Sequence, residues 1–73
     1  MIKISKEDKE YLEKYNIVIP VDSIEDLPNA LEIIDDAIVD NIVDHNDEPD
    51  AHGIRLQRIY DRIWADNRDE YER

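Results

Sequence analysis

Apolar residues recur at a helical spacing over two long stretches of the chain. A helix turns by about 100° per residue, so a helix over residues 27 to about 45 would carry one apolar stripe. The stripe consists of Leu27, Leu31, Ile34, Ile38 and Ile42. Residues 51 to the late sixties place a second inner face on another helix, made of His52, Leu56, Ile59, Tyr60, Ile63, Trp64 and Asn67. The polar stretch NDEPD at 46–50 interrupts the pattern through Pro49 and supplies Asp47 or Asp50 as the cap of the second helix. Two amphipathic helices joined by a short loop are expected to fold back as an antiparallel hairpin.

The first 22 residues predict different elements. Ser5 followed by Asp8 resembles a capping box, and the spacing after it predicts a short helix that ends near Asn16. IVIPV at 17–21 is β-branched and carries Pro20, so it predicts an edge strand that residues 2–4 pair with, or an extended connector.

Asp26 is expected to cap the helix that follows, where Pro28 is tolerated in the first turn. The predicted fold is therefore mainly α. A short N-terminal helix and an extended segment (residues 1–22) precede a helical hairpin (residues 23–73), all in one small domain. The last residues, NRDEYER at 67–73, are expected to fray.

Charge is distributed very unevenly along the chain. The formal net charge is −11, every Lys precedes residue 15, and every Arg follows residue 54. Between these limits lie eleven carboxylates, so the middle of the chain carries the whole net charge. Such a field repels nucleic acid and anionic lipid and attracts basic proteins. We therefore expect no direct nucleic-acid binding and no membrane binding, but a basic partner protein.

The acidic residues of the central helix follow a regular spacing. Glu32, Asp36, Asp40 and Asp44 lie four residues apart, opposite the apolar stripe. One interpretation is an ordinary solvated face. The other is a surface that imitates a nucleic-acid strand, because four helical residues rise about 6 Å, comparable with the separation of neighbouring phosphates. The second interpretation assigns partner binding to Glu32, Asp35, Asp36, Asp40, Asp44, Asp47 and Glu48.

Three aliphatic residues of the same helix project away from its main stripe: Ile33, Val39 and Val43. Covering by residues 17–21 is the simpler expectation. The alternative is contact with a second copy of the chain or with another partner, in a small structural module that forms a homodimer. On the last helix, Arg55, Arg58 and Arg62 share a flank and are expected to form salt bridges with the acidic helix across the hairpin.

Motifs for metal binding and catalysis are weak. The stretch from Asp44 resembles a calcium loop at its first positions but has Pro49 where Gly is needed and Arg55 where a bidentate Glu is needed. His45 and His52 do not have the spacing of a standard zinc pair, and the chain has no Cys. Ser5 and Ser23 are both interpreted as helix caps. We expect a protein that is not an enzyme, with no metal and no cofactor.

No apolar run approaches the roughly 20 residues that span a bilayer, and the first residues have no signal-peptide character. A cytoplasmic location is expected.

GIRLQRIYDRIWADN, residues 53–67, resembles the ends of small uncharacterised acidic proteins encoded by phages and prophages of Gram-positive bacteria. The likeness covers the last helix and part of the preceding acidic one: a helix with a leucine, an isoleucine-tyrosine pair and a closing asparagine. It implies a phage protein that inhibits or modulates a host protein, in the bacterial cytoplasm, and it transfers no functional residue.

Overall fold

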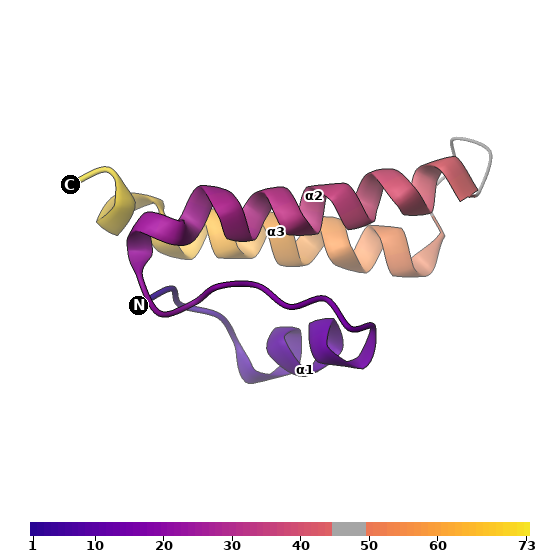
Figure 1. The fold of residues 1–73 in the computed structure, drawn as a ribbon, viewed down its shortest axis with the longest axis horizontal. Helices are drawn as coiled ribbons and strands as arrows, with labels where there is room; N and C mark the ends of the chain where they lie inside the picture. The colour runs from indigo at the N-terminus through magenta and orange to yellow at the C-terminus, as the bar shows by residue number, and fades with distance from the viewer. Residues whose placement is uncertain (45–49) are drawn as a thin grey trace.

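The computed structural model describes residues 1–44 and 50–73, with Val43 and Asp44 described by their backbone alone. Within these residues the chain forms three α-helices, α1 (Lys6–Lys14), α2 (Leu27–Asp44) and α3 (Ala51–Tyr71), and a short 3-10 helix, η1 (Ile24–Asp26). α2 and α3 lie side by side, and α1 with the segment after it lies along one side of this pair (Figure 1). The prediction of a mainly α fold with a short N-terminal helix is confirmed.

α1 begins and ends with capping interactions that the sequence indicates. The Ser5 hydroxyl accepts a hydrogen bond from the Asp8 amide at 3.2 Å, which confirms Ser5 as the N-cap. At the other end, Asn16 has a positive φ of 59°, and the Ile17 amide donates to the Leu12 carbonyl at 2.9 Å. This is a Schellman arrangement, in which Asn replaces the more usual Gly. The predicted end near Asn16 is confirmed.

Residues 17–21 form an extended connector. No strand is assigned to them or to any other described residue, although the Ile2 amide donates to the Val21 carbonyl at 2.8 Å. Pro20 has no amide hydrogen, which removes one donor that a ladder would need. Ile17, Ile19 and Val21 pack against the core, whereas Val18 points to solvent. Of the two predicted alternatives, the structure therefore has the connector.

The start of α2 differs from the sequence prediction. Asp26 is the last residue of η1, and Ser23 is the cap: its hydroxyl accepts a hydrogen bond from the Glu25 amide at 3.2 Å. The prediction that Asp26 caps the helix is wrong, because the chain already turns three residues earlier and passes from η1 directly into α2. Ser23 was predicted as a cap, and that is confirmed.

The core lies between α2 and α3 and is completed by the N-terminal residues. It consists of Ile2, Leu12, Leu27, Ala30, Leu31, Ile34, Ile38, Leu56, Ile59 and Ile63. Burying one such aliphatic side chain stabilises the fold by about 1.5 to 3 kcal/mol. Both predicted apolar faces are confirmed in outline, with Ile42 only half-buried and Trp64 37% exposed at the edge of the second face.

α3 is longer than predicted. It continues to Tyr71, and its residue Asn67 is fully buried. The Asn67 side chain accepts a hydrogen bond from the Lys3 amide at 2.6 Å and donates to the Lys3 carbonyl at 2.8 Å. The expectation that residues 67–73 fray is wrong at least through Tyr71, because these contacts fasten this end of α3 to the N-terminal segment.

In the described part of the chain, we find no helix with the length and apolar character needed to cross a membrane.

Candidate functional site

The acidic side chains of α2 that the structure describes are exposed to solvent. Glu32, Asp35, Asp36 and Asp40 all lie on its surface. Asp44 ends the helix, but its side chain is not described, and Asp47 and Glu48 lie outside the described residues. The structure thus places five of the seven predicted partner-binding residues on one helix, and four of them have described side chains that are exposed.

The acidic row winds around α2 instead of running straight along it. Each step of four residues turns by about 40°, so Glu32 and Asp40 differ by roughly 80° around the helix axis. Glu32 borders a hollow beside α3, whereas Asp40 borders a hollow on the other flank, near Tyr15 and His52. The row therefore connects two different surfaces of the molecule.

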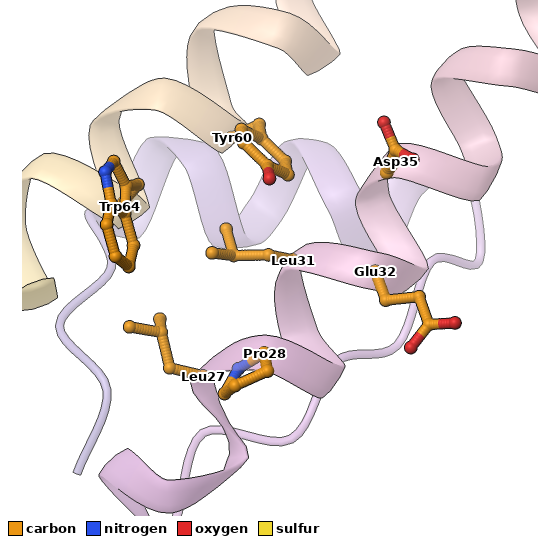
Figure 2. A pocket seen from close by; sticks show the side chains of 7 residues that line it. All are labelled: Leu27, Pro28, Leu31, Glu32, Asp35, Tyr60 and Trp64. Atoms are coloured by element: carbon orange, nitrogen blue, oxygen red, sulfur yellow. The ribbon is translucent and has the colours of Figure 1, made fainter. Parts of the chain in front are cut away.

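The hollow beside Glu32 is here called the α2–α3 groove. It has a volume of about 460 Å³ and is lined by Leu27, Pro28, Leu31, Glu32, Asp35, Tyr60 and Trp64. Figure 2 shows Tyr60 and Trp64 reaching in from α3, with Leu31 between them and the α2 carboxylates. An adjoining hollow continues past Asp35 to Gln57 and Asp61. The groove combines an apolar floor, two aromatic rings and a carboxylate rim.

Two of the three arginines on the flank of α3 bind a carboxylate of α1. The Arg62 Nη1 donates to both oxygens of Asp8, at 3.0 Å and 3.2 Å, and the Arg55 Nη2 lies 3.5 Å from Asp8 Oδ1. The Asp8 side chain is 1% exposed, whereas both guanidinium groups are partly exposed. The prediction that Arg55 and Arg62 pair with the acidic helix is wrong, because their flank of α3 faces α1.

An aromatic cluster extends this contact between α1 and α3. The Tyr11 hydroxyl and His52 Nδ1 share a hydrogen bond at 2.7 Å, and the rings of Tyr15 and His52 have centroids 4.1 Å apart. The Arg55 guanidinium lies 4.9 Å from the centre of the Tyr11 ring, within cation–π range. Burial, followed by the neighbouring Tyr15, raises the pKa of Tyr11 above its ordinary value of 10.0, and Arg55 opposes this shift.

His52 thus packs against α1. It lies in the first turn of α3, and the sequence also predicted it near the start of this helix. The other histidine, His45, lies outside the described residues. Asp50 caps α3 by accepting a hydrogen bond from the Gly53 amide at 3.0 Å, which confirms one of the two predicted caps. Asp47, the other predicted cap, is not described.

The apolar residues beside the acids remain exposed. Ile33 is 37% and Val39 is 48% exposed, so the expectation that residues 17–21 cover them is wrong. The reason is that Ile17, Ile19 and Val21 turn toward the core. The side chain of Val43 is not described. On the helix, Ile33 and Val39 stand about 120° apart, with Asp36 between them.

The described residues contain no group of three or more His, Cys, Asp or Glu side chains arranged to hold a metal ion. Ser5 and Ser23 are both engaged as caps.

Sequence reasoning missed two features of this surface. Asp8 was interpreted only as part of a cap, and its buried pairing depends on where α1 docks, which no local pattern encodes. The α2–α3 groove was missed because Trp64 was assigned to the inner face, although its position at the edge of that face was a signal of partial exposure. Comparison of the chain with protein-family models, with curated proteins and with solved structures finds no match.

Proposed function

We propose that this protein is a non-enzymatic binding protein that recognises a basic partner through the acidic surface of α2. The observation that carries the proposal is the exposure of Glu32, Asp36 and Asp40 on a helix that contains no Lys or Arg. The two ends of the chain are balanced in charge, so the net charge originates from the middle of the chain, and α2 carries five of the eleven carboxylates there.

A merely solvated face would not need this arrangement. Like charges four residues apart on a helix cost about 0.2 to 0.5 kcal/mol per pair, and Asp is a weaker helix former than Glu. Alternating Glu with Lys would keep the helix soluble without that cost. Ion pairs that could offset the repulsion are formed elsewhere, since Arg55 and Arg62 bind Asp8 on the far flank of α3.

The partner that fits this surface is a host protein that normally binds nucleic acid. In the proposal, α2 and α3 are the antiparallel arms of a hairpin, and the carboxylates on α2 take the place of phosphates. The winding of the row by about 40° per step supports this idea, because phosphates also wind about their axis. The resemblance of residues 53–67 to phage proteins suggests the setting: an inhibitor or modulator of a bacterial protein in the host cytoplasm.

The test is capture of partners from a Gram-positive bacterial lysate at several salt concentrations. The variant Asp36→Asn, Asp40→Asn, Asp44→Asn is compared with a control that removes the same charge from α3 and its cap, Asp66→Asn, Asp69→Asn, Glu72→Gln. We expect the α2 variant to lose a partner that the control still captures, and we expect that capture to weaken as salt rises. Equal capture by both variants would refute a role for the acidic surface.

The second candidate is a structural module that forms a homodimer, and the exposure of Ile33 and Val39 favours it. Because the two residues stand on either side of Asp36, a second copy would also have to accommodate that carboxylate. Light scattering over a range of concentrations tests this candidate. A dimer that dissociates when Ile33 and Val39 are both changed to Ser would support it, and a strict monomer at every concentration would exclude it.

A further inference from the structure

The α2–α3 groove has a lining that suits one type of side chain. Leu27, Pro28 and Leu31 form an apolar floor, and Tyr60 and Trp64 stand at one side of it (Figure 2). Glu32 and Asp35 stand at the other side, where a positive charge would be favoured. A ligand that fits must therefore carry an apolar stem and a cationic, preferably planar, head.

The described residues that line this groove carry no positive charge. The seven lining residues include no Lys or Arg, and α2 has none along its whole length. Arg55 and Arg62 are held by Asp8 on the opposite flank of α3, and the Arg68 Nε lies 3.8 Å from the carboxylate of Asp69. Asp61 at the adjoining hollow adds further negative charge. Charge complementarity thus points to a cation supplied by a partner.

We propose that the α2–α3 groove receives an arginine side chain of the partner protein. The methylene stem of the arginine lies on Pro28 and the accessible edge of Leu31, as the stems of long basic side chains do on apolar surface. Its guanidinium stacks against Trp64 or Tyr60 and donates hydrogen bonds to Asp35 and Glu32. This inference rests on the proposed function, and it names the groove as the part of the acidic surface where a partner is anchored.

Arginine fits better than lysine for two physical reasons. A guanidinium is planar and weakly hydrated, so it loses less on leaving water to lie on an aromatic ring, and its fork of donors matches a carboxylate. An ammonium is a compact and strongly hydrated charge, which benefits less from the rings. Trp, Tyr and Arg are also the residue types that dominate binding energy at protein interfaces.

Trp64 provides a direct readout, because it is the only tryptophan in the chain. The full-length protein is titrated with three capped peptides that differ only at the central residue: arginine, lysine, or citrulline, the neutral isostere of arginine. All three have the same flanking lysines. We expect saturable changes in Trp64 emission with the arginine peptide, and binding weaker by about tenfold with the citrulline peptide, as the loss of a charge-assisted hydrogen bond implies.

Two variants with equal charge locate the binding site. Glu32→Gln with Asp35→Asn changes the rim of the groove, whereas Asp66→Asn with Asp69→Asn removes the same charge from α3 outside the groove and outside the acidic surface of α2. All four residues are exposed, so both proteins should fold, which far-UV circular dichroism and the urea midpoint verify. We expect the rim variant to bind the arginine peptide about tenfold more weakly and the other variant to change affinity less than about threefold.

Equal binding of the arginine and citrulline peptides would overturn the inference, and so would equal losses in the two variants. Loss in the Asp66 and Asp69 variant alone would also overturn it, because these residues lie outside the groove. Capture of a lysate partner by the unchanged protein but not by the α2 triple variant would still support the proposed function. The two proposals can therefore fail separately.

Discussion

The Asp8 carboxylate on α1 accepts two hydrogen bonds from one nitrogen of Arg62 on α3, at 3.0 Å and 3.2 Å. The two residues are 54 positions apart, and the Asp8 side chain is buried. Arg55 reaches the same carboxylate and stacks on Tyr11, so one anion of α1 organises two cations of α3. This contact lies on the flank of the α2–α3 pair that the N-terminal residues cover, whereas the groove lies on another flank, between α2 and α3.

Replacing Asp8 by Asn should lower the free energy of unfolding by about 1 to 3 kcal/mol, because the charge-assisted hydrogen bonds are lost. The cost should stay below that of breaking a fully buried pair, since both guanidinium groups are partly exposed and can be hydrated. Urea denaturation measures it. Glu7→Gln, an exposed acid of the same helix, is the control and should change stability by less than about 0.5 kcal/mol.

A double-mutant cycle separates this pair from other effects. If Asp8 and Arg62 interact as described, then Asp8→Asn combined with Arg62→Gln should cost clearly less than the sum of the single changes. If the costs of the two single changes simply add, Arg62 stabilises the fold through a contact other than Asp8, for instance with the acidic helix, as the sequence first indicated.

Asn67 should be among the most sensitive polar positions of the chain. Its side chain makes hydrogen bonds with both backbone groups of Lys3 and with the Ile63 carbonyl at 2.8 Å. Asn67→Ala removes all three, so we expect a loss of about 2 to 4 kcal/mol in urea denaturation. The Lys3 amide should also exchange its hydrogen faster. Asn29→Ala, at an exposed position of α2, is the matched control. Unchanged exchange at Lys3 would contradict the described contact.

The elements that the sequence predicted best are those with local physical causes. The spacing of Leu27, Leu31 and Ile34 follows from helical geometry, and Ser5 satisfies amide donors only a few residues away. The failures involve tertiary docking. Nothing near Asp8 in the sequence indicates Arg62, and the ion pair depends on the flank of α3 on which α1 docks. The groove could be found only in part, because a position at the edge of a stripe does not specify whether a neighbour covers it.

Two adjacent isoleucines of α2 test which face of this helix is turned toward the core. Ile34 is fully buried in the core, whereas Ile33 is exposed. Ile34→Ala should therefore cost about 2 to 5 kcal/mol through lost burial and the cavity that remains. Ile33→Ala should change stability by less than about 1 kcal/mol, helped by the higher helix propensity of Ala. Urea midpoints give both values. Similar losses at the two positions would mean that Ile33 is covered in solution, as it would be in a homodimer.

Tyr11 should make the stability of the fold sensitive to alkaline pH. Burial raises the pKa of its hydroxyl above 10.0 in the folded state, so the folded protein holds this proton at pH values where the unfolded chain releases it. The resulting stabilisation is complete below the unfolded pKa and is lost as pH rises through the folded pKa. We expect the free energy of unfolding to fall above pH 10 in urea denaturations at stepped pH.

Tyr11→Phe should reduce this fall. Because the change also removes the hydrogen bond to His52, the informative quantity is the slope of the free energy of unfolding against pH. Tyr71→Phe, near the exposed end of α3, is the control and should leave the slope unchanged. An identical slope in the Tyr11→Phe variant and the unchanged protein would show that another group controls the alkaline transition.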